Sequence, residues 1–159
     1  MPTTRRSRTV ADAPERVWET VSDPYHLPRW WPRVDRVEAV TDEAFTEVLV
    51  TDGGRAVRAD FRVADSVAPQ LRAWEQELAG SPFERIMVAA RTEVRLAAHD
   101  TGTRVTLSVR QKMRGPAQLG GFMVRRATRK VLDDALKGLD GLHGGHDGAG
   151  GAPEVRDGA

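Results

Sequence analysis

The stretch IMVAARTEVRLAAHDTGTRVTLSVRQKM, residues 86–113, decides the fold class of this chain. Apolar or small residues alternate with polar ones on both sides of the turn Asp100-Thr101-Gly102. A period of two is typical of a β-strand with one face toward a core and the other toward water. The stretch therefore predicts a long antiparallel hairpin. Its inward-facing set comprises Ile86, Val88, Ala90, Thr92, Val94, Leu96, Val105, Leu107, Val109, Gln111 and Met113.

The same period extends back to Val34, broken by turn residues at intervals that suit an antiparallel meander. Asp52-Gly53-Gly54 separates a strand over 45–50 from one over 55–65, and Ala68-Pro69 leads into a strand over 71–78. Six strands after residue 34, with a first strand at about 4–10, predict seven.

Helical patterns lie on either side of this strand region. Asp12 is expected to cap a short helix that ends before Pro24, and a second short helix or turn follows as far as Pro32. Residues 117–142 carry apolar residues at three- and four-residue spacing, which predicts one long amphipathic helix. Because helices do not alternate with strands, a parallel doubly wound sheet is excluded. The order predicts an α+β fold, a strongly curved antiparallel sheet wrapped round the C-terminal helix.

The domain organisation follows from length and from a change of composition. A chain of 159 residues fits one domain. After Leu142 the sequence becomes rich in glycine and cannot bury enough apolar surface to order itself. We therefore predict a folded domain over residues 1–142 and a flexible tail over 143–159.

Composition excludes several classes of protein. The chain has no cysteine, which excludes a disulfide scaffold, a thiolate metal site and a cysteine nucleophile. Its apolar runs are far shorter than the roughly 20 residues that span a bilayer, so we expect no integral membrane association. No apolar segment follows the basic N-terminus, and a cytoplasmic location is the expectation.

Several short motifs resemble a known family. The segment Ala13-Pro14-Glu15-Arg16-Val17-Trp18, with Ser22-Asp23-Pro24 and residues 27–32, resembles the opening of the START-like (SRPBCC) superfamily, in its polyketide cyclase/dehydrase branch. Residues 102–106 and the start of the last helix near Gly120-Gly121 are similar to that family too. The likeness covers about residues 4–142. It implies a helix-grip fold, with a cavity between sheet and helix for lipids, polyketides or other apolar molecules, in a family of carriers, receptors and cyclases.

Inward-facing apolar residues are the candidates for lining such a cavity. Gln76 and Thr92 lie among them and could orient a ligand carbonyl or hydroxyl. The alternative is that these side chains simply fill the core. The predicted ligand-binding set is Trp30, Trp31, Phe61, Trp74, Gln76, Thr92, Val94, Val105, Leu107, Phe122 and Met123, the last two as a gate beside Gly120 and Gly121.

Catalysis would need titratable groups at the cavity. His26 is the candidate base, and Tyr25 or Arg29 the candidate donor that polarises a carbonyl. The alternative is that Asp23-Pro24-Tyr25-His26 is a capped surface turn. An enzyme should hold at least two converging titratable groups against the cavity, whereas a carrier needs only apolar walls and an entrance.

Other chemistry is weakly supported. His143 and His146 share a spacing that suits a metal, but without a third ligand we expect no metal and no cofactor. Eight basic residues and no acidic one lie between Thr101 and Leu132, which could form a basic helix face for an acidic partner or merely a solvated face. With 24 basic and 23 acidic residues overall and no recognition motif, nucleic-acid binding is not expected.

Three functions remain open from the sequence. The first is binding of a hydrophobic or aromatic small molecule in the internal cavity. The second is a polyketide cyclase or dehydratase that acts in the same cavity. The third is an interaction module that presents the basic helix face. Neither the ligand nor the oligomeric state follows from the sequence.

Overall fold

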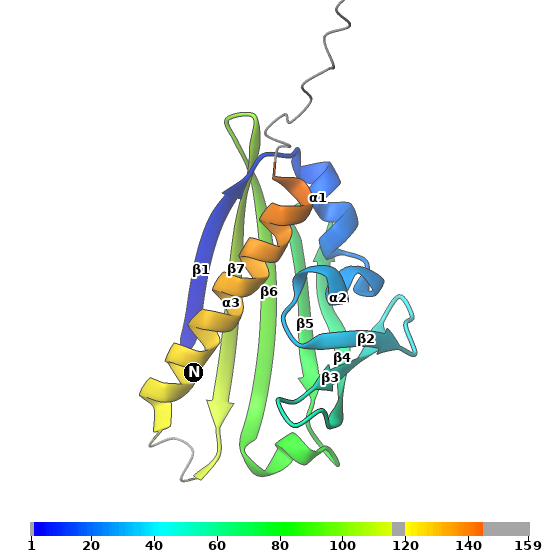
Figure 1. Ribbon diagram of the computed structural model, residues 1–159, viewed down its shortest axis with the longest axis vertical. Helices are drawn as coiled ribbons and strands as arrows, with labels where there is room; N and C mark the ends of the chain where they lie inside the picture. The colour runs from blue at the N-terminus through cyan, green and yellow to red at the C-terminus, as the bar shows by residue number, and fades with distance from the viewer. Residues whose placement is uncertain (1, 116–119, 145–159) are drawn as a thin grey trace, which may run out of the picture.

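The computed structural model describes residues 2–115 and 120–144, and in this part all strands belong to one antiparallel sheet (Figure 1). Its strand order is β1-β7-β6-β5-β4-β3-β2. The strands are β1 (Thr3–Val10), β2 (Val34–Glu38), β3 (Ala44–Val50), β4 (Ala56–Val67), β5 (Leu71–Glu77), β6 (Met87–His99) and β7 (Gly102–Met113). The α+β sheet of seven strands predicted from period-two alternation is confirmed.

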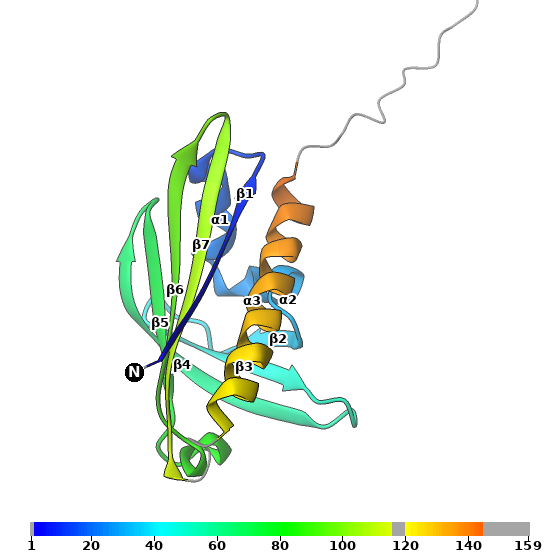
Figure 2. The same cartoon turned by 90° about the vertical axis from the view of Figure 1, so that its left-hand side faces the viewer.

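The helices lie on the concave side of the sheet. The helices and 3₁₀ helices are α1 (Pro14–Val21), η1 (Pro24–His26), α2 (Leu27–Trp30), η2 (Pro82–Arg85) and α3 (Gly121–His143). Figure 2 shows α3 running alongside the strands while β2 and β3 curve round toward it. This is the helix-grip arrangement that the family resemblance implies.

The core lies between the upper part of the sheet and the C-terminal half of α3. Leu132, Leu136 and Leu139 of α3 are buried against residues such as Val105 and Leu107 of β7. Burial of a leucine side chain contributes roughly 1.5–3 kcal/mol, so this end of the helix is held firmly.

Gly138 lets α3 approach α2 closely. A Cβ atom on Gly138 would lie 2.5 Å from the carbonyl oxygen of Trp30 and 2.8 Å from its Cα. Both are backbone atoms, which cannot move aside without shifting α2. The absence of a side chain at this position therefore sets the distance between the two helices.

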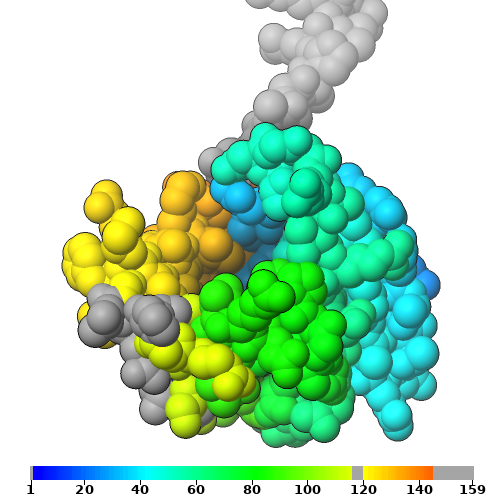
Figure 3. Space-filling model, turned by 90° about the horizontal axis from the view of Figure 1, so that it is seen from below, coloured from blue at the N-terminus to red at the C-terminus, as the bar shows by residue number. Residues whose placement is uncertain are grey.

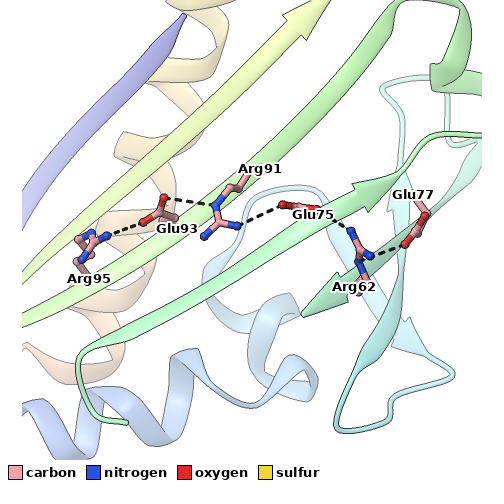
Figure 4. A network of polar contacts seen from close by, with 6 residues as sticks. All are labelled: Arg62, Glu75, Glu77, Arg91, Glu93 and Arg95. Atoms are coloured by element: carbon pink, nitrogen blue, oxygen red, sulfur yellow. Dashed lines mark hydrogen bonds and ion pairs between the residues drawn. The ribbon is translucent and has the colours of Figure 1, made fainter. Parts of the chain in front are cut away.

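The outer face of the sheet is a ladder of opposite charges (Figure 4). Positively and negatively charged side chains alternate across β4, β5 and β6. A carboxylate oxygen of Glu75 lies 2.7 Å from a guanidinium nitrogen of Arg62, and the other lies 3.2 Å from one of Arg91. Exposed pairs of this kind contribute little each to stability. They keep this face of the sheet hydrophilic. The ladder consists of Arg62, Glu75, Glu77, Arg91, Glu93 and Arg95.

Two local predictions need correction. Ala13, not Asp12, is the N-cap of α1, and one oxygen of the Asp12 carboxylate accepts from the Ala13 N–H instead. In β6 the register shifts between Met87 and Ala89, so Met87 is buried while Val88 is 44% exposed, contrary to simple alternation. The extra residue of a β-bulge reverses which side chains face inward.

The two ends of the last helix also differ from the prediction. The predicted helix begins at residue 117, whereas α3 begins at Gly121. Residues 117–119 lie outside the described residues. His143, assigned to the tail, is the last residue of α3. The rest of the predicted tail, residues 145–159, lies outside the described part of the chain.

Candidate ligand-binding site

A pocket of about 400 Å³ lies between the sheet and the N-terminal half of α3. Its walls comprise inward-facing residues of β3 to β7, part of η2 and one side of α3. Seen from below, the molecule is hollowed between α3, in yellow to orange, and the green segment that contains η2 (Figure 3). Sites for small molecules typically enclose about 300–1,000 Å³, so this pocket has room for a compact ligand.

One wall of the pocket is aromatic. Trp31, which follows α2, meets the ring of Trp74 on β5 edge to face, with centroids 6.0 Å apart. Phe61 on β4 stacks on Phe45 at 5.3 Å, and Phe45 in turn lies 6.2 Å from Trp74. Because each ring is held by another, this wall is already formed without a ligand.

Glu47, in the middle of β3, is a buried carboxyl on the same pocket wall. Its residue is only 4% exposed, and it shares the inward face of the strand with Phe45 and Leu49. Within residues 2–115 and 120–144 the carboxyl has no hydrogen-bond or ion-pair partner. Burial disfavours the charged form and raises the pKa of Glu47 to about 8. The carboxyl is therefore mostly protonated at neutral pH.

Four neutral polar side chains complete the lining. Gln76 on β5 and Thr92 on β6 make no side-chain hydrogen bond within the described part of the chain, so both are available to a ligand. Thr128 of α3 donates to the Val124 carbonyl at 2.8 Å, and its hydroxyl lies 3.3 Å from Oε1 of Gln111 on β7. A mainly apolar pocket with a few polar groups of this kind can orient a ligand as well as enclose it.

The structure divides the predicted ligand-binding residues into three groups. Five of them line the pocket, and they are Trp31, Phe61, Trp74, Gln76 and Thr92. Four are buried in the packed core above it, and they are Trp30, Val94, Val105 and Leu107. Val94, Val105 and Leu107 do face inward, but at this level α1 and α3 cover β6 and β7, and the side chains pack into the core.

Phe122 and Met123, predicted to gate the cavity, form the third group. They are 65% and 75% exposed and are not among the pocket-lining residues. The helix face that meets the pocket is instead Val124, Ala127, Thr128 and Val131, at spacings of three and four residues. Phe122 and Met123 at the start of α3 therefore lie outside the face that meets the pocket.

Tyr25, His26 and Arg29 lie together on the surface of η1 and α2. His26 Nδ1 lies 3.2 Å from a guanidinium nitrogen of Arg29, and its Nε2 lies 3.7 Å from the Asp23 carboxylate. Asp23 also accepts from the Tyr25 N–H, and the Tyr25 side chain is 63% exposed. None of these residues is among those that line the pocket. The local geometry is that of a capped surface turn.

The sequence analysis missed Glu47, although a signal for it exists. In AFTEVLV, residues 44–50, Glu47 falls in phase with Phe45 and Leu49 on the inward face of a strand. Burying a carboxyl at such a position costs free energy, which marks the residue as a candidate functional group. The alternation in this strand could therefore have singled out Glu47. Met87 was missed for a different reason, because the bulge in β6 cannot be read from alternation.

A second polar cluster joins the C-terminus of α3 to α1. His143 Nδ1 lies 2.8 Å from the Asp12 carboxylate, and Nε2 lies 2.7 Å from the Thr20 hydroxyl. The order acid, histidine, hydroxyl resembles a hydrolytic triad. However, Thr20 is buried, and none of the three residues lines the pocket. The cluster therefore ties the end of α3 to the N-terminal segment.

The basic stretch predicted as one face is divided in space. Arg104, Arg110 and Lys112 alternate with inward residues of β7 and so point to the outer side of the sheet. Arg125 and Arg129 are exposed on α3, which lies on the concave side. The two groups are thus on opposite sides of the sheet.

Two further properties concern metals and membranes. Within the described residues no group of three or more histidine or acidic side chains is arranged to hold a metal ion. No helix in the same part of the chain is both long enough and apolar enough to cross a bilayer.

Comparison with solved structures places the fold among START-like proteins. A START superfamily protein from Mycobacterium smegmatis superposes with a TM-score of 0.73 at 14% identity, over 89% of this chain and 96% of that one. A protein from Thermus thermophilus gives 0.71 at 20% identity, over 88% and 95%. The di-domain ARO/CYC StfQ from the steffimycin biosynthetic pathway gives 0.67 at 14% identity, over 89% of this chain and 50% of that one.

Sequence comparison supports the same assignment. No curated protein matches this chain. The family described as polyketide cyclase/dehydrase and lipid transport matches residues 1–143, which include every helix and strand described above. Because this match covers the whole described fold, the chain belongs to the polyketide cyclase/dehydrase and lipid transport family.

Proposed function

We propose that the protein binds a mainly apolar small molecule in the pocket between the sheet and α3. The observation that carries this proposal is the preformed aromatic wall of Trp31, Phe61 and Trp74 around a space of about 400 Å³. A ligand that covers the apolar side chains facing this space removes them from water, which favours binding. The family description, which includes lipid transport, supports the same class of ligand.

A neutral fluorescent probe tests this proposal. N-phenyl-1-naphthylamine should bind to the purified protein with increased emission. The variant Ala90→Phe, which fills the pocket from β6, should weaken that binding at least about tenfold, because the added ring occupies ligand space. Ala97→Phe on the exposed outer side of the same strand is the matched control and should bind as the parent does. Equal binding by all three proteins would place the ligand elsewhere.

Catalysis in the same pocket is the second candidate, and Glu47 is the observation that favours it. A carboxyl that is protonated at neutral pH can donate a hydrogen bond or a proton to a ligand carbonyl. Glu47 is the one titratable acid or base among the described lining residues, whereas the sequence criterion asked for two. Mass spectrometry of a soluble poly-β-ketone incubated with the protein, or with Glu47→Gln, tests it. Cyclised product formed only with an intact Glu47 would support turnover.

A further inference from the structure

Glu47 lacks a counter-charge inside the pocket. The described residues that line the pocket include no lysine, arginine or histidine. Val37 and Ala59, its partners on the neighbouring strands, are uncharged. Arg72, on the inward face of β5, is not part of the pocket lining and interacts with Asp23 and Asp42. A buried carboxyl without a partner is unfavourable, and a ligand that enters the pocket can supply one.

The surroundings of Glu47 favour a positive ligand group over other partners. Trp31, Trp74 and Phe61 line the same pocket, and an aromatic ring attracts a cation that lies over its face. An anionic headgroup would meet the acidic side chain with no positive side chain to offset it. A neutral carbonyl finds its donors in Gln76 and Thr92, so it does not need Glu47.

We propose that the pocket takes an apolar molecule that carries one basic nitrogen, with the Glu47 carboxylate as the counter-charge that binds it. This inference rests on the proposed function and specifies the ligand class for the same pocket. The apolar part of the ligand contacts the aromatic wall, and the protonated nitrogen lies against Glu47.

Binding of such a ligand must release a proton. In the free protein Glu47 is protonated at pH 7, because burial raises its pKa to about 8. A protonated amine binds the ionised form, so the carboxyl proton goes to the buffer when the ion pair forms. Affinity should therefore increase by up to about tenfold per pH unit below pH 8 and then level off.

Three probes with one ring system separate the ligand's charge from its apolar surface. 2-Naphthylmethylamine, 2-naphthalenemethanol and 2-naphthoic acid are cationic, neutral and anionic at pH 7. In calorimetric titrations at pH 8 the amine should bind at least about tenfold more tightly than the alcohol, and the acid more weakly than either. At pH 7, titrations in buffers of different ionisation enthalpy should show the release of about one proton with the amine and none with the alcohol.

Two glutamine variants identify the residue responsible. Glu47→Gln keeps the size and removes the charge, and should reduce the preference for the amine over the alcohol to less than about twofold, because the amine loses its counter-charge. Glu43→Gln removes an exposed carboxylate from the start of the same hairpin and should behave as the parent does. Thermal unfolding of both variants establishes that they are folded.

The outcomes distinguish failure of this inference from failure of the proposed function. Alcohol binding as tight as amine binding, or an amine preference that survives Glu47→Gln, overturns the basic-nitrogen assignment and leaves an apolar binding pocket in place. Failure of all three probes to bind the parent protein overturns both.

Discussion

Glu47 shows how burial alone can change the chemistry of a single residue. An exposed glutamate titrates near 4.5, but in the pocket wall its pKa is raised to about 8 without any charged neighbour. Neither the residue type nor its place in the strand gives this value, because desolvation depends on burial by the folded chain, which brings other segments to the same pocket wall.

The pKa of Glu47 predicts a pH-dependent stability. The pKa is raised in the folded state, so the stabilisation from the bound proton is complete below pH 4.5 and is lost as the pH rises toward 8. Glu47→Gln should therefore unfold at a similar urea concentration to the parent at pH 4.5, and be more stable by a few kcal/mol, in order of magnitude, at pH 8. Glu43→Gln is the control, and parallel pH profiles for the parent and Glu47→Gln would contradict the assignment.

The contacts of His143 at the other end of the molecule should stabilise the fold. Replacing His143 by alanine removes the contacts to Asp12 and Thr20 and should lower the free energy of unfolding by about 1–3 kcal/mol. The exposed His99→Ala is the control. A double-mutant cycle with Asp12→Ala should show coupling, and additive effects would mean that the two side chains act independently.

The same contact affects acid stability. The hydrogen bond from His143 holds the pKa of Asp12 below its usual value. Its contribution is present above pH 3.8 and is lost as the pH falls through the lower, folded-state pKa. The His143→Ala variant should lack this loss of stability at low pH. Measuring the free energy of unfolding of the parent and the variant between about pH 2 and pH 5 tests it.

The packing of α3 against α2 depends on one position in the helix. Gly138→Ala should destabilise the protein by about 1–3 kcal/mol, because the new methyl group meets the backbone of Trp30. Gly141, three residues later, has no atom within 4 Å of an added Cβ, so Gly141→Ala should stabilise the helix by up to about 1 kcal/mol. Thermal unfolding of the pair gives opposite shifts, and shifts of the same sign would contradict the close approach.

Strands and helices differ in how far their residues could be assigned from sequence. Alternation identified the inward faces of β4 and β5, since Phe61, Trp74 and Gln76 do line the pocket. It failed in β6 at Val88, where a bulge shifts the register. In α3 the three- and four-residue spacing indicated the helix, but the gate predicted at Phe122 and Met123 is exposed and does not line the pocket.

Across the whole molecule, α3 joins a packed core at one end and a pocket at the other. Leu139 is fully buried in the core, so Leu139→Ala should cost about 2–5 kcal/mol of stability. Val131 is only partly buried and lines the pocket, so Val131→Ala should cost less than about 1 kcal/mol while enlarging the ligand space. Urea unfolding of the two variants measures the difference, and equal losses would mean that the helix is packed evenly along its length.

The order of strands and helices and the curved antiparallel sheet follow from periodicity and turn residues, because these patterns depend on near neighbours in the chain. The family resemblance adds the helix-grip arrangement. The position of the pocket depends on how closely α3 approaches the sheet at each level. That distance depends on how residues such as Leu132 pack into the core, against segments far apart in sequence. Val94 and Thr92 are therefore equivalent in the strand pattern, yet one is packed under the helix and the other faces open space. The difference depends on whether side chains from distant segments fill the space over each residue. Alternation along one strand gives no information about that space.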